Sequence, residues 1–152
     1  MLSPSSQHEL TVTEKVSLLQ SLSIFDETPV TILTDLAPLM EQLEVAAGTD
    51  VFKEDETGES MYIIASGSIH IHRRSTTLAV LHQHQVFGEL SLLDAEKRSA
   101  TATAKVNCLL FKIDQAPFYQ LIDARPEVAR GFIKILCSRL RVLNEKTVYN
   151  SL

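Results

Sequence analysis

The run MYIIASGSIHIHR at residues 61–73 decides the fold class, because it contains two β-type patterns separated by a glycine. Its first five residues are apolar, and isoleucine then alternates with histidine. Alternation with a period of two places Ile69 and Ile71 on one face of a strand and His70 and His72 on the other. The stretch predicts two consecutive strands whose isoleucines face a core and whose histidines face outward.

Further short β-type runs lie on both sides of this stretch, at residues 43–47, 51–53, 78–82, 99–104 and 109–113. Seven short strands separated by turn signals indicate an antiparallel barrel or sandwich. Thr101 and Thr103 alternate with three alanines, which predicts a strand whose inner face carries small side chains. A small inner face leaves room for a ligand.

Helical patterns flank the predicted strands. Apolar residues at helical spacing predict a helix over residues 9–23, with Thr11 or Thr13 and Glu14 at its start. Thr28 followed by Pro29 predicts the cap and first residue of a second, short helix. After the strands, Asp114 is expected to cap a helix through residue 121, and a longer helix is expected over residues 126–146, opening with a proline.

These limits describe one domain in a chain of 152 residues. We expect a disordered arm at residues 1–8, a single domain at 9–147 and a short tail at 148–152. Within the domain, the strands occupy about 42–113 and the closing helices about 114–147.

Composition excludes several protein classes. The content of 45% apolar and 22% charged residues fits a folded domain, and two cysteines are too few for a disulfide scaffold or a cysteine-ligated metal cluster. No apolar run is long enough to span a bilayer and no signal peptide is evident, which predicts a soluble, cytoplasmic protein. Residues 1–60 carry 12 acidic and 2 basic side chains, which argues against direct nucleic-acid binding.

The last predicted helix carries an apolar seam with steps of four and three residues. The seam consists of Ala129, Ile133, Leu136, Leu140 and Leu143. This spacing is typical of a coiled coil, so a homodimer through residues 126–146 is one interpretation. Packing of the same seam on the chain's own barrel is the other, and both stay open.

The chemistry is concentrated in FGELSLLDAEKRSAT at residues 87–101. Gly88 permits a sharp turn, residues 89–93 predict one or two turns of helix, and an arginine follows at the mouth of the next strand. The N–H groups of Leu90 and Ser91 at the helix start can hold a phosphate, and Arg98 can supply its charged partner. The hydroxyl of Ser99 is a further donor.

A carboxylate beside this anion pocket needs a separate explanation. Glu89 is suited to accept hydrogen bonds from sugar hydroxyls, as acidic residues do in dinucleotide sites. Glu89 with Arg98 therefore indicates a ligand that carries both a sugar hydroxyl and a phosphate. A simple salt bridge between the two residues is the structural alternative.

The motif FGELSLL followed by RSAT resembles the phosphate-binding cassette of cyclic nucleotide-binding domains. The likeness covers about residues 22–146 and includes the segment GESMYII at residues 58–64; four of the five glycines fall where the family turns its strands. The resemblance implies a mainly β domain with flanking helices (α+β): an eight-stranded antiparallel, jelly-roll-like β-roll with N-terminal helices and two C-terminal helices. It also implies a regulatory sensor whose C-terminal helices move when a cyclic nucleotide binds.

The same resemblance implies roles for individual residues. Glu89 matches the acid that holds the ribose 2′-hydroxyl, and Arg98 matches the arginine on the cyclic phosphate. Backbone contacts from Gly88, Leu90 and Ser91 and a hydroxyl contact from Ser99 are implied as well. In the catabolite activator protein of bacteria, a member of this family, a consecutive Thr and Ser read adenine; at the matching positions this chain has Leu143 and Asn144. The base is therefore open, with cyclic AMP favoured over cyclic GMP because it is the commoner ligand of the family.

Two alternative functions remain. The pairs His70/His72 and His82/His84 have the spacing of strand-borne metal ligands, as in cupin-like enzymes, although the outward phase of the first pair disfavours a metal site. A β-roll that has lost its ligand and serves as an interaction module is the other, disfavoured because Glu89 is retained together with the arginine. We expect no catalytic residues, metal or cofactor other than the ligand, and no output domain after the last helix; the effector partner is left open.

Overall fold

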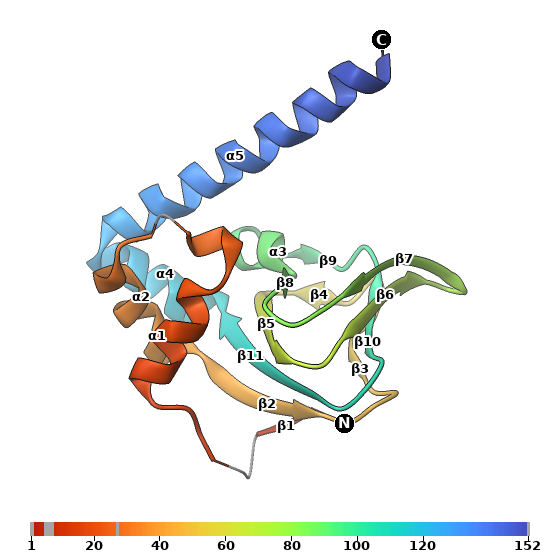
Figure 1. Ribbon diagram of the computed structural model, residues 1–152, viewed down its shortest axis with the longest axis horizontal. Helices are drawn as coiled ribbons and strands as arrows, with labels where there is room; N and C mark the ends of the chain where they lie inside the picture. Colours follow the sequence, from red (N-terminus) through yellow and green to blue (C-terminus); the bar gives the residue numbers. More distant parts are fainter. Residues whose placement is uncertain (1, 5–7, 27, 152) are drawn as a thin grey trace.

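The computed structural model describes residues 2–4, 8–26 and 28–151 (Figure 1). The helices are α1 (Val12–Gln20), α2 (Val30–Leu36), α3 (Glu89–Leu93), α4 (Gln115–Ala124) and α5 (Pro126–Ser151), with 3-10 turns η1 (Ser23–Phe25) and η2 (Ala37–Leu39). The strands are β1 (Leu2–Pro4), β2 (Glu41–Val45), β3 (Asp50–Phe52), β4 (Thr57–Gly58), β5 (Ser60–Ser66), β6 (Ile69–Arg73), β7 (Thr76–Leu81), β8 (Val86–Phe87), β9 (Glu96–Lys97), β10 (Thr101–Ala104) and β11 (Cys108–Asp114).

The strands form two main antiparallel sheets. One has the order β1-β2-β11-β5-β8, the other β3-β10-β6-β7, and β4 pairs with β9. Apolar side chains from both main sheets meet in one core, which includes Leu43, Ile64, Ile69, Ala102 and Leu110. The expected antiparallel β domain with helices at both ends is confirmed, and every strand predicted from the residue pattern is present.

The described residues contain eleven strands, where the resemblance implies eight and the residue pattern predicts seven, so four are additional to the pattern. Three of the additional ones, β4, β8 and β9, are two residues long, too short to produce an apolar alternation. The fourth, β1, lies in the predicted disordered arm and corrects that prediction, because Leu2–Pro4 pairs with β2. Residues 1 and 5–7 of that arm lie outside the described residues.

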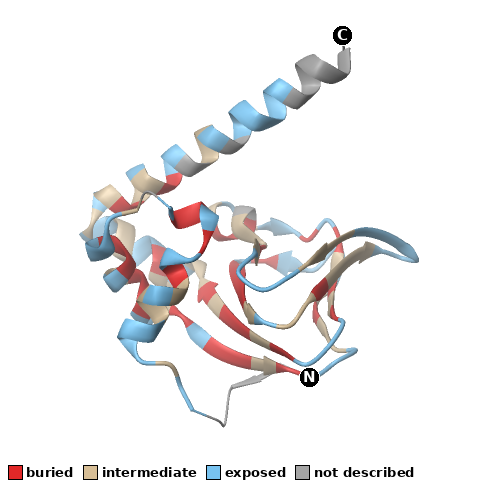
Figure 2. Ribbon diagram, in the orientation of Figure 1, coloured by how far each residue is buried: buried red, intermediate tan, exposed pale blue. Residues whose placement is uncertain are grey.

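The alternation predicted for β6 and β10 is present. Ile69 is fully buried and Ile71 packs on the same core, while Ala102 and Ala104 form a small, buried inner face. Burial is concentrated between the sheets and beneath the helices (Figure 2). The small inner face on β10 therefore lies inside the β-roll.

The N-terminal helices cover one end of the roll. Thr11 and Glu14 form a complete capping box at the start of α1, as the sequence predicts. The start of α2 differs by one residue, because Pro29 itself is the N-cap, with ψ of 143°, and not the first helical residue. A second apolar cluster joins these helices to the sheet and to the C-terminal helices through Phe25, Phe118 and Phe132.

The last two helices are longer than predicted. Helix α4 continues to Ala124, and α5 continues to Ser151, so the expected tail at 148–152 is helical up to residue 151; residue 152 lies outside the described residues. Helix α5 projects away from the β-roll (Figure 1). Near the start of α5, Val128 and Phe132 are buried, whereas Ile133, Leu140 and Leu143 are exposed. The far part of the predicted apolar seam thus does not pack on the chain's own barrel.

Candidate nucleotide site

Strand β8 ends in a sharp turn that leads into α3. Gly88 has φ of +75°, a region that favours glycine, and the Ser91 N–H donates to the Gly88 carbonyl over 3.1 Å. The turn and the short helix at Glu89–Leu93 agree with the sequence prediction. Because the Ser91 amide already has this partner, its contact with a ligand stays a prediction.

Arg98 lies in the interior of the molecule, with only 6% of its surface exposed. Its Nη2 donates to the backbone carbonyl of Ser60 over 3.0 Å, whereas Nε and Nη1 have no hydrogen-bond partner among the described residues. Buried donors without partners cost free energy, about 1–3 kcal/mol each and more when charged. The interior of the molecule therefore holds a buried cation whose hydrogen bonds are incomplete among the described residues.

Two glycines make room for this guanidinium. A Cβ on Gly58 would fall 2.1 Å from Arg98 Nε, and one on Gly88 would fall 2.7 Å from Nη1. Both distances are shorter than any real contact, so a side chain at either position would displace the guanidinium. The ring of Phe52 lies on the arginine, with 4.0 Å between Cζ and the ring centroid. These residues form a cradle shaped to Arg98.

The electrostatics of the cradle favour an added anion. Burial lowers the pKa of the Arg98 guanidinium, and the charge of the Glu56 carboxylate opposes this only in part. Burial also raises the pKa of Tyr62, which keeps its phenol neutral and so removes it as a counter-charge. An oxyanion beside Arg98 would pair the charge and accept from the unpartnered nitrogens.

Glu89 and Arg98 do not form the salt bridge that would have been the structural explanation of the pair. The ion pairs among the described residues do not include Arg98. Glu89 instead lines a groove of about 990 Å³ between α3, the turn η1, the start of α2 and helix α5. Arg98 is not among the residues that line this groove.

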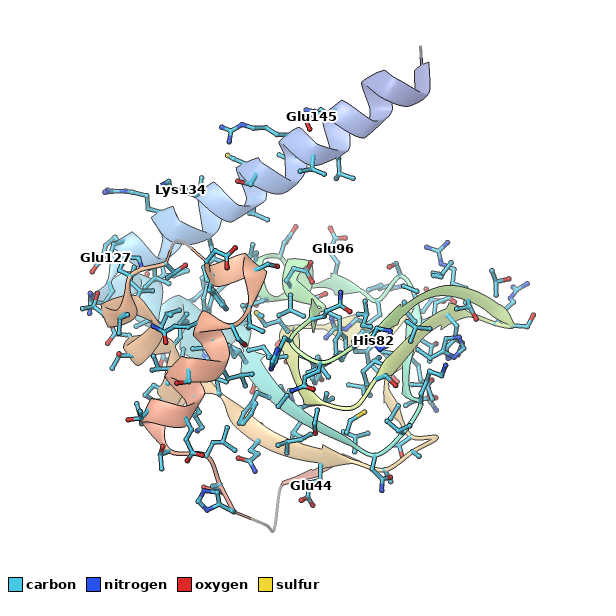
Figure 3. The ribbon with its side chains drawn as sticks, viewed as in Figure 1. Glu44, His82, Glu96, Glu127, Lys134 and Glu145 are labelled. Atoms are coloured by element: carbon cyan, nitrogen blue, oxygen red, sulfur yellow. The ribbon has the colours of Figure 1, made fainter. Side chains whose placement is uncertain are left out.

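The groove also contains one of the two candidate base contacts. Leu143 lines it together with Glu89, Arg130 and Lys134, whereas Asn144 is exposed and is not part of the lining. Lys134 lies on the first half of α5, close to the base of the helix (Figure 3). Helix α5 therefore forms one wall of the groove that Glu89 lines.

The remaining predicted residue, Ser99, is exposed, and its carbonyl accepts a hydrogen bond from Arg73 Nε over 2.7 Å. The sequence predicted the ribose and phosphate contacts in residues 88–99 and did not identify Phe52, Gly58 and Ser60 as residues of the site. These residues come from β3, β4 and β5; the pairing of β4 with β9 places Gly58 near the arginine, and the pairing of β3 with β10 positions Phe52. A two-residue strand pair leaves no pattern in a single sequence.

The histidines do not assemble a metal centre among the described residues. His70 and His72 are half-buried, and their rings pair by hydrogen bonds with Thr77 and Thr103, each over 2.8 Å. His82 and His84 are exposed. The metal-enzyme alternative therefore has no support in this structure.

The environment of Cys108 gives no support to nucleophilic catalysis. Burial raises the pKa of the Cys108 thiol, whose Sγ lies 3.3 Å from the Ser68 carbonyl and 3.2 Å from the Val106 carbonyl. A raised pKa keeps the thiol protonated and unreactive.

No helix in the described part of the chain is long and apolar enough to cross a membrane.

Comparison with known proteins agrees with this geometry. The family model of the cyclic nucleotide-binding domain matches residues 42–125, more than half of the chain. The CRP-like cAMP-activated global transcriptional regulator of Mycobacterium tuberculosis is 29% identical over 132 residues, covering 84% of this chain and 59% of the relative. The cyclic AMP receptor protein of Thermus thermophilus is 34% identical over 99 residues, covering 62% of this chain and 46% of the relative.

A solved structure is similar over most of the chain. The N-terminal domain of a transcriptional regulator from Streptomyces coelicolor superposes with a TM-score of 0.79 and 28% identity, covering 86% of this chain and 94% of that one. The chain spans about half to three fifths of the length of the two curated relatives above.

Proposed function

The chain belongs to the cyclic nucleotide-binding domain family, and from this premise we propose that it is a non-catalytic sensor of cyclic AMP. One observation carries the proposal. Arg98 is buried in a cradle that fits its guanidinium, yet two of its nitrogens have no hydrogen-bond partner among the described residues. A cyclic phosphate supplies the missing acceptors and the missing negative charge.

Each predicted site residue has a role in this function. Arg98 holds the cyclic phosphate, and Glu89 accepts a hydrogen bond from the ribose 2′-hydroxyl. Gly88, Leu90 and Ser91 present backbone groups to the ribose and phosphate, and the Ser99 hydroxyl is a further donor. The turn at φ of +75° supports this arrangement because it leads from β8 directly into the first residues of α3.

The preference for cyclic AMP is supported by the names of the relatives, one described as cAMP-activated and the other as a cyclic AMP receptor. The groove next to Glu89 supports a contact between the base and Leu143. Leucine offers an apolar surface to a purine and no hydrogen bond, so base selection through this residue is weak. Asn144 is exposed and would need α5 to rotate before it reached the base.

A chain of hydrogen bonds connects Arg98 with the responding helices. The Ser60 carbonyl accepts from Arg98, and the Ser60 hydroxyl donates over 2.6 Å to Asp114, the N-cap residue of α4. Asp114 makes no side-chain cap to its own helix. When the phosphate draws on Arg98, Ser60 shifts, and the start of α4 moves with it.

This route predicts a specific loss of coupling. Ser60→Ala removes the hydroxyl but keeps the carbonyl, so binding should persist while the response of α4 weakens. Hydrogen exchange of α4 with and without cyclic AMP measures the response, and Ser66→Ala, at the exposed end of β5, is the matched control. An undiminished response in Ser60→Ala would rule out this route.

We also propose that α5 associates with a second copy of the chain. Ile133, Leu140 and Leu143 are exposed along one seam, and such a seam is stabilised when two helices bury it together. Ligand binding at Glu89 then biases how α5 is presented to its partner. A cytoplasmic location, no direct contact with nucleic acid and no cofactor besides the nucleotide complete the proposal.

Isothermal titration with cyclic AMP, cyclic GMP and cyclic di-GMP tests the function. We expect heat of binding with cyclic AMP, weaker binding of cyclic GMP and none of the dinucleotide. The absence of heat with all three would refute the sensor function and favour a ligand-free interaction module.

A further inference from the structure

The last residue of β3, Phe52, presents its ring to the pocket arginine. Arg98 Cζ lies 4.0 Å from the centroid of this ring and 6.0 Å from that of Tyr62. Phe52 is supported in turn by Tyr62 and Phe87, whose ring centroids lie 6.0 and 5.9 Å away. The arginine therefore rests on an aromatic cluster inside the β-roll.

An aromatic ring and a carboxylate in this position would have different effects on the charge of Arg98. A buried cation is ordinarily held by a carboxylate, which neutralises it. Arg98 makes no ion pair with any described residue. The face of an aromatic ring attracts a cation through its quadrupole and leaves the positive charge available to another anion.

We propose that Phe52 is a positioning residue of the nucleotide site, holding the Arg98 guanidinium in the place where the cyclic phosphate binds. This inference rests on the proposed function and adds a residue outside the segment 87–101. The ring covers the guanidinium, Ser60 holds Nη2, and Nε and Nη1 stay without partners among the described residues. The arginine is thus restrained before the ligand arrives.

The effect on affinity follows from the populations of the free protein. If the ring attracts the guanidinium less strongly, Arg98 spends part of its time in other rotamers, where its charge is solvated. Binding must then restore the buried rotamer, and the apparent affinity falls in proportion to the lost population. From the strength of cation–π contacts, we expect a loss of roughly two- to thirtyfold.

The test varies the electron density of the ring and keeps its size. Mono-, tri- and pentafluorophenylalanine are incorporated at position 52, and cyclic AMP affinity is measured by titration calorimetry together with the melting temperature. The same series at Phe111 of β11, which is fully buried in the other apolar cluster, is the matched control. Phe52→Leu removes the ring quadrupole altogether and should weaken cyclic AMP binding, whereas Phe52→Trp keeps an aromatic face and should bind as the wild type does.

We expect affinity to fall stepwise with fluorination at position 52 and to stay constant in the Phe111 series. A purely structural role would change the melting temperature without this dependence on electron density. Unchanged affinity across the position-52 series would overturn the proposal. Rising affinity would also overturn it, because the arginine would then have to leave the ring to reach the phosphate.

A second readout separates this inference from the proposed function. In the ligand-free protein, the Arg98 Nε–H should give a slowly exchanging NMR signal shifted upfield by the Phe52 ring, and Phe52→Leu should abolish the shift. If the wild type binds no cyclic nucleotide, the proposed function fails, and with it the role of Phe52 in binding, whatever this signal shows. If the wild type binds and the signal is absent, only the role of Phe52 fails.

Discussion

Replacing Arg98 by methionine tests the site most directly. Methionine keeps much of the apolar bulk that packs on Phe52 but removes the charge and all donors. The structure leaves Nε and Nη1 without partners, so a phosphate gains at least two charge-assisted hydrogen bonds there. At about 1.5–3 kcal/mol each, their loss amounts to about 3–6 kcal/mol. We expect cyclic AMP affinity to fall by at least about a hundredfold.

The same substitution should not destabilise the ligand-free protein. Arg98→Met leaves the Ser60 carbonyl without its donor, yet it also removes a buried charge whose hydrogen bonds are incomplete. These changes oppose each other, so we expect a melting temperature equal to or above that of the wild type. Loss of binding without loss of stability distinguishes a ligand-binding arginine from one that supports the fold.

Calorimetry for affinity and differential scanning calorimetry for stability are measured on the same preparations. Arg74→Met in the exposed β6–β7 turn carries the same change of charge and is the matched control. Affinity of Arg98→Met within threefold of the wild type would refute the assignment of the phosphate to this residue. A large drop in its melting temperature would refute the stability argument.

Further substitutions test the other parts of the structure. Glu89→Gln should weaken cyclic AMP binding about tenfold but leave 2′-deoxy cyclic AMP unaffected, and calorimetry showing equal losses would contradict its ribose role. Gly58→Ala should weaken binding more than tenfold, because its Cβ would fall 2.1 Å from a guanidinium nitrogen. In helix α5, a Cβ added at Gly131 would meet no neighbouring segment within 4 Å. Because alanine favours the helix more than glycine does, Gly131→Ala should raise the free energy of unfolding by about 0.5–1 kcal/mol in chemical denaturation. The hydrogen bond from Arg125 is the main cause that lowers the Glu127 pKa from 4.5, so this stabilisation is complete above that pH and is lost as pH falls below it. In Arg125→Met, the melting temperature should therefore fall less steeply than in the wild type as the pH is lowered. An equally steep fall in both proteins would contradict this.

The ion pairs of Arg125 also show what a local pattern can and cannot predict. Arg125 contacts Asp35 of α2 and Glu127 of α5, residues that are 90 and 2 positions away in the chain. Glu127 and Lys134 occupy the first half of α5, where the helix leaves the body of the protein (Figure 3). Only the near partner is visible in a helical pattern, whereas the distant one depends on how α2 packs.

The same distinction explains the predicted and missed strands. Seven strands had enough residues to show apolar runs or alternation, and all are present. Strand β1 carries no such pattern and forms because β2 offers an unpaired edge. The extension of α5 to Ser151 was not predicted, because the last residues of this helix lack apolar side chains at helical spacing.

The sequence by itself determined the antiparallel β domain with flanking helices, the turn at Gly88, the short helix after it and the pairing of Glu89 with Arg98 as candidate ligand residues. These features depend on neighbours along the chain, where period, glycine and charge can be read directly. Only the tertiary structure decided that Arg98 is buried without an ion pair among the described residues, that Phe52 and Ser60 hold it, and that Glu89 shares a groove with α5. Those contacts depend on the register and packing of distant segments, and a single sequence carries no direct signal for them.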